Sequence, residues 1–437
     1  MTRGAAASLL GLPAQPAMPS STGRAAGPEL LLRSLLTLGP AAREEDVRTI
    51  LSPDVDHWRQ NPKPATAILA GLAKKRLPGV AEKVLGFMLA SRVEVNVFHC
   101  SAAISACEKA GQWQLALSIL SKMPDLGVMP NEFSCSSAIS ACEKGGQWQL
   151  ALSLLSSMPE TKVSPNEVSY SAAISACEKG GQWQLALSLL SNMPALRATP
   201  NQISFSAAIS ACEKAGQWQV ALALLSDMPE IRMRPDTISF NSAMSACAKG
   251  GKWQLALCLV SDMRGLEAIP DDISFNAVIS ACEKGGRWQL ALSLMIDMAQ
   301  MGAKPTEFTY SSAISACAKG GQWEVALCLL SDMPVMSVRP DDICCSAALS
   351  AFEKSGRWQH AVQLLGAMPQ MRVLYDEFSY SSAISACAKA GEWRLALDLL
   401  SSMPETRVMP NEVSFNAAIV ACEDTSRAKQ LLAGRPI

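Results

Sequence analysis

The sequence predicts an all-α fold, a right-handed α-solenoid of stacked 35-residue helix-turn-helix repeats. The first observation behind this prediction is an invariant period, because nine tryptophans from Trp113 to Trp393 each lie 35 residues from the next. The second is the pattern within a period, where two apolar stripes at helical spacing are separated by a glycine-containing break. One hairpin cannot bury two apolar stripes, so neighbouring copies are expected to cover them by stacking.

The composition agrees with such a stack and limits the kinds of partner. Hydrophobic residues make up 49% of the 437 residues and aromatic residues only 5%, so small apolar side chains are expected to do most of the packing. The formal net charge is −1, from 38 basic and 39 acidic residues. This balance excludes the global charge of a nonspecific nucleic-acid binder, so any anionic partner must meet a local arrangement of charge.

The 15 cysteines are placed by the repeat and form no ligand cluster. One repeat position holds cysteine in nearly every copy and Phe352 in one, which is typical of buried packing. The members of this position are Cys107, Cys142, Cys177, Cys212, Cys247, Cys282, Cys317, Cys387 and Cys422. No Cys-x-x-Cys pair occurs, so we expect a reducing compartment, no disulfide framework, no metal site and no cofactor. The adjacent Cys344 and Cys345 are interpreted as structural.

The N-terminal 28 residues contain Arg3 and Arg24, lack acidic residues, and are rich in Ala, Ser, Gly and Pro. This composition is typical of an organellar transit peptide and also of a disordered N-terminus. No apolar run approaches the roughly 18 residues of a membrane-spanning helix, so no membrane partner is expected.

Residues 29–61 are predicted to form an N-terminal cap of short helices, around Leu30–Leu38 and Glu44–Leu51, each followed by a proline. Residues 62–96 are predicted to be a degenerate repeat with Pro78 in place of the tryptophan. Nine full copies follow, at 97–131, 132–166, 167–201, 202–236, 237–271, 272–306, 307–341, 342–376 and 377–411. Residues 412–437 are predicted to be a partial repeat and C-terminal cap, because the pattern is lost after Cys422.

Copy 132–166 illustrates the predicted hairpin. Cys135, Ala138, Ile139 and Cys142 form one helical stripe, which ends at Lys144-Gly145-Gly146. A second helix is predicted from about Gln147 to Met158, ended by Pro159, and Val163–Asn166 is the turn into the next copy.

The copies resemble pentatricopeptide repeats of the plain 35-residue type. The resemblance is carried by openings such as Glu167-Val-Ser-Tyr-Ser171, by Ile174–Gly181 and Leu185–Leu190, by Met193, and by the closing Pro200-Asn201. It covers residues 97–411 well and 62–96 poorly. It implies binding of single-stranded RNA with one nucleotide per repeat. It further implies a role in mitochondrial or chloroplast RNA processing, stability or translation, through occupancy or recruitment of a separate RNA-processing enzyme.

In this family two side chains of each repeat read one base, namely residue five and the last residue. Here these positions are Ser101 with Asn131, Ser136 with Asn166, Ser171 with Asn201, Ser206 with Asp236, Asn241 with Asp271, Asn276 with Thr306, Ser311 with Asp341, Ser346 with Asp376, and Ser381 with Asn411. All are short polar residues that can hydrogen-bond a base edge. Their chemistry equally fits helix N-capping and turn formation, so the residues alone leave both interpretations open.

The family's pairing rules, carried over to these residues, imply a ten-base target. Ser with Asn suits A, Ser with Asp suits G, Asn with Asp suits U, and Asn276 with Thr306 implies a pyrimidine, Y. Thr66 with Asn96 of the degenerate repeat resembles an A reader. Read from the N-terminus along RNA 5′ to 3′, the implied sequence is AAAAGUYGGA.

Two further positions recur in every full copy. Residue two is apolar, and in the family it wedges between successive bases; the alternative is packing against the preceding hairpin. Its members are Phe98, Phe133, Val168, Ile203, Ile238, Ile273, Phe308, Ile343 and Phe378. Residue 13 is lysine, which would follow the phosphates or pair with the helix dipole. Its members are Lys109, Lys144, Lys179, Lys214, Lys249, Lys284, Lys319, Lys354 and Lys389.

No catalytic constellation is recognised, so the chain is not predicted to be an enzyme. The three histidines, His57, His99 and His360, lie near no ligand or nucleophile at a recognisable spacing. The deaminase elements His-x-Glu and Pro-Cys-x-x-Cys are absent from the sequence, as is a Gly-x-x-x-x-Gly-Lys-Ser/Thr phosphate loop. The competing hypothesis is a helical-repeat scaffold for proteins, in which the polar positions would be caps alone.

Overall fold

The computed structural model describes residues 27–196, 198–266 and 268–421, and these residues form helices, turns and loops without a β-strand. The predicted transit segment, apart from its last two residues, and the end of the predicted C-terminal cap lie outside these ranges. The chain divides into two compact units, residues 1–145 and 146–437, and each is described by itself. Within each unit the predicted all-α architecture of stacked helical hairpins is confirmed.

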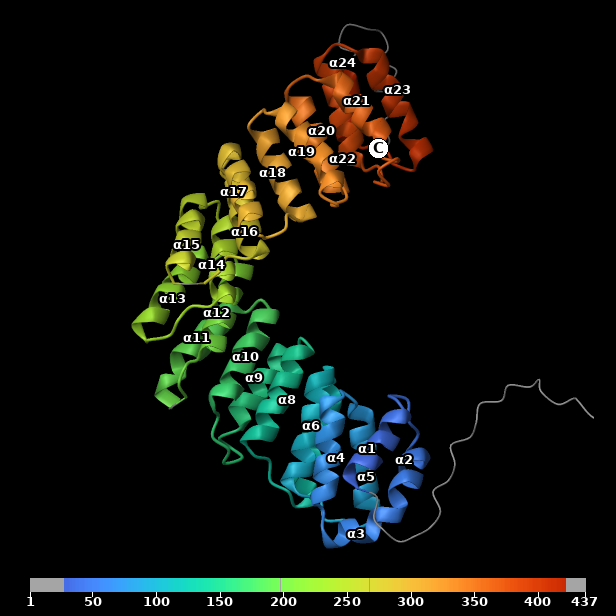
Figure 1. Cartoon of the computed structure of the whole chain (residues 1–437), viewed down its shortest axis with the longest axis vertical. Helices are drawn as coiled ribbons and strands as arrows, with labels where there is room; N and C mark the ends of the chain where they lie inside the picture. Colours follow the sequence, from blue (N-terminus) through green and yellow to red (C-terminus); the bar gives the residue numbers. More distant parts are fainter. Residues whose placement is uncertain (1–26, 197, 267, 422–437) are drawn as a thin grey trace, which may run out of the picture. The chain divides into compact units, whose positions relative to one another are not determined.

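The first unit begins with helices that cover a hairpin. Its elements are α1 (Pro28–Thr37), α2 (Glu44–Leu51), the 3₁₀ turn η1 (Ser52–Asp54), α3 (Val55–Gln60), α4 (Lys63–Lys74), α5 (Pro78–Ala90), α6 (Val97–Ala110), α7 (Trp113–Lys122), η2 (Pro124–Leu126) and α8 (Glu132–Lys144). Helix α1 packs on α4 and α2 packs on α5 (Figure 1). Helix α3 was not predicted; Pro53 begins a turn that leads into it, and its Trp58 is 1% exposed.

The second unit repeats one hairpin. Its elements are α9 (Trp148–Ser157), α10 (Glu167–Lys179), α11 (Trp183–Asn192), η3 (Pro194–Leu196), α12 (Gln202–Lys214), α13 (Trp218–Glu230), α14 (Thr237–Lys249), α15 (Trp253–Gly265), α16 (Asp272–Lys284), α17 (Trp288–Gln300), α18 (Glu307–Lys319), α19 (Trp323–Val335), α20 (Asp342–Lys354), α21 (Trp358–Ala367), α22 (Glu377–Lys389), α23 (Trp393–Ser402), η4 (Pro404–Thr406) and α24 (Glu412–Ala421). From copy 167–201 onward, the first helix of each copy packs against the first helix of the next copy and against the second helices on either side.

The two consecutive glycines of a copy have different structural reasons. Gly181 has a φ of +69°, the left-handed conformation that ends α10 at little cost for a residue without Cβ. Gly180 has an ordinary φ of −81° but lies under the indole of Trp148 from the preceding copy. A Cβ at Gly180 would lie 2.3 Å from Trp148 Cδ1, so this glycine provides space for the tryptophan.

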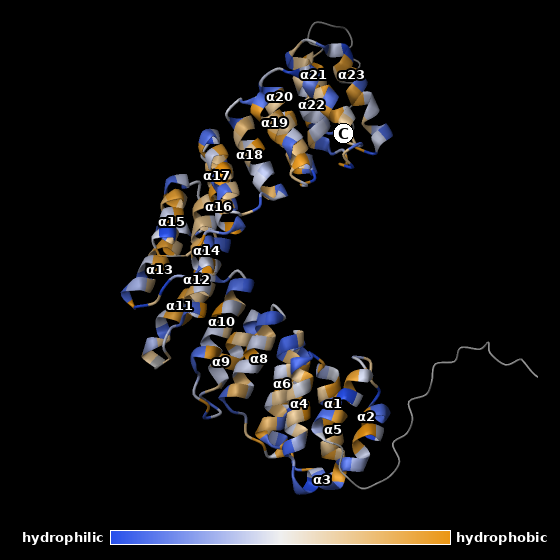
Figure 2. Cartoon of the chain, in the orientation of Figure 1, coloured by the Kyte–Doolittle hydropathy of each residue, from blue (hydrophilic) through white to orange (hydrophobic). Residues whose placement is uncertain are grey.

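The core consists of small and flexible apolar side chains, as the composition predicts. In copy 167–201, Cys177, Ala186 and Met193 are fully buried. The prediction that the cysteine position is buried packing is confirmed, and burial raises the pKa of Cys177 to about 11. The repeated tryptophans are less completely buried than these residues, since Trp183 is half-buried. Figure 2 shows the resulting mixture of apolar and polar faces on the helices.

Candidate functional site

Residue five and the last residue of a copy meet in space, although 30 positions separate them. We call these two residues the polar pair of the copy. Four consecutive copies of the second unit join their pairs by side-chain hydrogen bonds. The joined pairs are Ser171 Oγ with Asn201 Oδ1 at 3.1 Å, Ser206 Oγ with Asp236 Oδ1 at 3.3 Å, Asn241 Nδ2 with Asp271 Oδ1 at 3.0 Å, and Asn276 Nδ2 with Thr306 Oγ1 at 3.4 Å.

The last residue of every copy is also the N-cap of the following first helix. Its side-chain oxygen accepts a hydrogen bond from the backbone N–H of the third residue of the next copy, at 2.9 Å for Asn201 and Ser204. The N-caps are Asn96, Asn131, Asn166, Asn201, Asp236, Asp271, Thr306, Asp341, Asp376 and Asn411. Capping is therefore a real role of these residues. In Asn201, Asp236 and Asp271 capping uses Oδ1, so Nδ2 or Oδ2 keeps its chemistry for a ligand, whereas Asn411 Nδ2 already donates to Glu377 Oε2 at 3.0 Å.

The hydroxyl groups of the other residue-five serines are arranged in two ways. Ser136 Oγ, Ser381 Oγ and Ser311 Oγ each donate to a backbone carbonyl oxygen of their own helix. Ser101 Oγ and Ser346 Oγ are buried without a hydrogen-bond partner among the described residues. Ser171 and Ser206 also donate to a carbonyl oxygen of their own helix, so this local bond is compatible with a joined polar pair.

The apolar residue two of each full copy projects away from the core. Its exposed fraction lies between 53% and 66%, the limits being Phe378 and Phe98. More than half of each of these side chains therefore stays exposed and is not buried by the preceding hairpin. Phe308, Ile343 and Phe378 from three successive copies line one open depression of about 400 Å³. Ser311, Ser346 and Asp376 of the polar pairs line the same depression, so the two classes of predicted site residue share a surface in the second unit.

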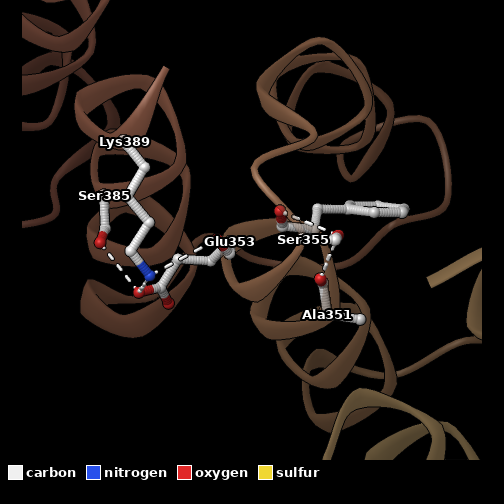
Figure 3. A network of polar contacts seen from close by, with 6 residues as sticks. Ala351, Glu353, Ser355, Ser385 and Lys389 are labelled. Carbon is white, nitrogen blue, oxygen red and sulfur yellow. Dashed lines mark hydrogen bonds and ion pairs between the residues drawn. The ribbon is translucent and has the colours of Figure 1, made fainter. Parts of the chain in front are cut away.

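Most residue-13 lysines are paired with a carboxylate of the preceding copy. The Nζ–Oε1 distances lie between 2.6 and 3.0 Å for Lys144 with Glu108, Lys214 with Glu178, Lys249 with Glu213, Lys319 with Glu283, and Lys389 with Glu353. Figure 3 shows the Glu353 carboxylate of α20 between Lys389 and Ser385 of α22, and Ser385 Oγ donates to it at 2.8 Å.

Three lysines differ because the preceding copy has alanine where the others have glutamate. The alanine that replaces the pairing glutamate is Ala248 for Lys284, Ala318 for Lys354 and Ala73 for Lys109. Within the described residues these three lysines have no ion pair. The row of cations is therefore neutralised unevenly, and its free charges lie at these three positions.

The histidine in the first full copy has a structural role. His99 is buried in α6, where its Nδ1 accepts the Asn96 N–H at 3.1 Å and its Nε2 lies 3.1 Å from the Pro62 carbonyl oxygen. Burial lowers the pKa of His99, while the Pro62 carbonyl opposes that shift. Across the described ranges, no group of three or more His, Cys, Asp or Glu side chains is placed to hold a metal ion. No helix in those ranges is long and apolar enough to cross a membrane.

The fold and site define a class of protein: a helical-repeat solenoid that presents one polar pair and one exposed apolar side chain per copy. Sequence profiles of four related families match this chain. They are the pentacotripeptide-repeat region of PRORP (residues 81–226), the PPR repeat family (270–319), the pentatricopeptide repeat domain (370–425) and the PPR repeat (238–267, 308–338 and 343–373). The chain belongs to the pentatricopeptide repeat family.

A solved structure shows the same fold at low sequence identity. The pentatricopeptide repeat protein PPR10 from maize is 17% identical, with 92% of this chain and 68% of that chain covered and a TM-score of 0.52. PPR10 in complex with an 18-nt psaJ RNA element is also 17% identical, with coverages of 94% and 67% and a TM-score of 0.47. The PPR domain of Arabidopsis thaliana PRORP1 in complex with tRNA is 14% identical, with coverages of 41% and 94% and a TM-score of 0.37. No curated protein sequence matches the chain.

Proposed function

We propose that the chain binds single-stranded RNA in a sequence-selective manner, one base per copy, along the surface that carries the polar pairs. The observation that carries the proposal is the joining of residue five to the last residue in four consecutive copies. Two polar side chains held together in one copy can address the edge of one base, which neither could define alone.

The chemistry of the last residue accounts for the implied choice of base. After capping, Asn201 keeps an Nδ2 donor, which suits the N1 acceptor of adenine. Asp236 keeps a carboxylate oxygen, which suits the N1–H of guanine, and Asp271 suits the N3–H of uracil. Burial raises the pKa of Asp271, but hydrogen bonds from the Ser274 backbone, Asn241 and the Ser274 hydroxyl outweigh this and lower it overall. Asp271 is therefore an ionised acceptor at neutral pH.

The exposed residue-two side chains supply contact that does not depend on the base. An apolar or aromatic side chain against a base contributes roughly 1–3 kcal/mol. Ile238 is residue two of copy 237–271, Ile273 is residue two of the next copy, and they are 63% and 61% exposed. A base at the polar pair of that copy would lie between these two side chains, which would otherwise remain in water.

The cellular role that fits this binding is occupancy of a transcript segment in a mitochondrion or chloroplast. A bound solenoid would block nucleases, prevent base pairing or recruit a separate RNA-processing enzyme. The transit-like composition of residues 1–28 supports the organelle, and the family supports the class of ligand.

Binding to the RNA AAAAGUYGGA tests the proposal, with a shuffled RNA of the same composition as the control. The chain should bind the ordered sequence more tightly. Asp236→Asn should shift the preference at the fifth base from G toward A and leave the other positions unchanged. Equal binding of ordered and shuffled RNA would overturn selectivity. Absence of RNA binding, with capture of an extended peptide, would favour the scaffold hypothesis.

A further inference from the structure

The third residue of each copy lies beside the polar pair of the preceding copy. It is the third residue of a first helix and is fully buried in the second unit, as Ser204, Ser239, Ser274, Thr309, Cys344 and Ser379 show. Its backbone N–H donates to the side chain of the last residue of the preceding copy, which caps the helix. Its side chain makes further contacts that capping alone does not require.

Three consecutive copies place this hydroxyl against residue five as well. Ser274 Oγ lies 2.6 Å from Asn241 Oδ1 and 2.9 Å from Asp271 Oδ1, so its single proton faces two acceptor oxygens. Together with the Asn241–Asp271 bond, these contacts close a triangle of three side chains. Thr309 Oγ1 repeats the arrangement, at 2.5 Å from Asn276 Oδ1 and 3.1 Å from Thr306 Oγ1.

Ser239 makes the same two contacts with the polar pair of copy 202–236. Ser239 Oγ lies 2.8 Å from Ser206 Oγ and donates to Asp236 Oδ1 at 2.7 Å. In all three copies the third-residue hydroxyl therefore touches both members of the polar pair that precedes it.

The hydroxyl has a specific consequence for an asparagine at residue five. The amide of Asn241 is nearly symmetric in shape, so a half-turn would exchange its oxygen and its NH₂ group. Donation from Ser274 Oγ to Oδ1, together with acceptance of the Nδ2 proton by Asp271 Oδ1, favours the orientation with Nδ2 on the Asp271 side. The pair then presents one pattern of donors and acceptors instead of two.

Copy 342–376 lacks the hydroxyl, because its third residue is Cys344. The Cys344 N–H still donates to Asp341 Oδ1 at 2.8 Å, but the Cys344 Sγ lies 3.9 Å from the Glu307 carbonyl oxygen. Burial, followed by the Asp341 carboxylate, raises the pKa of the Cys344 thiol, so the group stays protonated and is a weak donor. Ser311 Oγ, the residue five of the preceding copy, donates to the Phe308 carbonyl oxygen at 3.0 Å.

We propose that a third-residue hydroxyl that touches both members of the preceding polar pair, as in Ser239, Ser274 and Thr309, positions that pair for base selection, and that Cys344 relaxes selection by the Ser311–Asp341 pair. The inference rests on the proposed RNA binding. It predicts that the base opposite Ser311 and Asp341, the eighth of the ten, is discriminated less well than the base opposite Asn241 and Asp271, the sixth.

The test measures the dissociation constants of the full chain for the ten-base RNA and its single-base variants. Ser274→Ala should reduce the preference for U over C at the sixth base by about fivefold, the loss of one hydrogen bond. Ser274→Thr should retain it, because Thr309 fills the equivalent place. Cys344→Ser should raise the preference for G over A at the eighth base by a similar factor. Ser261→Ala, an exposed serine on α15, is the matched control.

The outcomes separate the two levels of inference. If Ser274→Ala weakens all sixth-base variants equally, or changes only the thermal midpoint, the third residue is merely a cap and the inference is overturned. The inference also fails if the wild type binds selectively and Cys344→Ser leaves the eighth-base preference unchanged. This second test holds even if Ser274→Ala does not fold. Lack of selective RNA binding by the wild type removes the proposed function itself.

Discussion

Asn241 Nδ2 donates a hydrogen bond to Asp271 Oδ1 at 3.0 Å across 30 positions of sequence. The bond joins the first turns of α14 and α16, because Asp271 is the N-cap of α16 and α16 packs directly on α14. In this copy the two variable positions therefore form one hydrogen-bonded unit. A substitution at either position should change the binding property of both.

Asn241→Ser should change the base read at one position. The substitution converts an Asn–Asp pair into the Ser–Asp pair already present at Ser206 and Asp236, so preference at the sixth base should move from U toward G. Fluorescence anisotropy with the four sixth-base RNAs measures this. The same substitution should leave fifth-base preference unchanged, and a change there would contradict one base per copy.

Ile273→Ala should weaken RNA binding without changing stability. Ile273 is 61% exposed, so its removal leaves no cavity, while loss of contact with a base is worth about 1 kcal/mol or about fivefold in affinity. Ile296→Ala is the matched control, since Ile296 is 60% exposed on the second helix α17. An equal loss of affinity in both variants would show that residue two has no special role.

The unpaired lysines should contribute more to phosphate binding than the paired ones. Lys354→Ala should reduce the slope of log affinity against log salt by about 0.7, the value for one phosphate contact on a single strand. Lys319→Ala should reduce it less, because Lys319 Nζ is already 2.9 Å from Glu283 Oε1. Glu283→Gln should release Lys319 and increase affinity at low salt. If every variant keeps the wild-type slope of log affinity against log salt, these lysines do not contact phosphates.

The hairpins and the positions of the polar-pair residues could be predicted from the sequence, because both recur every 35 residues. The second helix predicted from Gln147 to Met158 is α9, Trp148–Ser157. The lysine–glutamate pairs could not be predicted, since they join residues 36 positions apart and depend on how first helices stack. The third residue was missed for a similar reason: its serine was visible in the repeat, but its contact with the preceding copy was not.

Two glycine substitutions in the first unit should change stability in opposite directions. Gly111 ends α6 with a φ of +70°, so Gly111→Ala should lower the free energy of unfolding by about 1 kcal/mol. Gly86 lies exposed inside α5, and a Cβ added there would have no atom within 4 Å, so Gly86→Ala should raise it by about 1 kcal/mol. Urea denaturation measures both, and a shift of the same sign would contradict the assigned backbone roles.

The buried cysteine position should make stability fall at alkaline pH. Burial raises the pKa of Cys282 from 9.0 to about 11, so the folded chain retains a proton that the unfolded chain releases. The free energy of unfolding is unaffected by this thiol below pH 9. It falls by about 1.4 kcal/mol per pH unit for each thiol as the pH rises from 9 toward 11.

Urea denaturation between pH 8 and pH 11 should therefore give a shallower decline for Cys282→Ala than for the wild type. Alkylation provides an independent check, because Cys258 and Cys328 are exposed and the other cysteines in the described residues are buried. Iodoacetamide should label these two in the folded chain and spare Cys282 until urea unfolds it. Rapid labelling of Cys282 in the native chain would show that the stack opens at that copy.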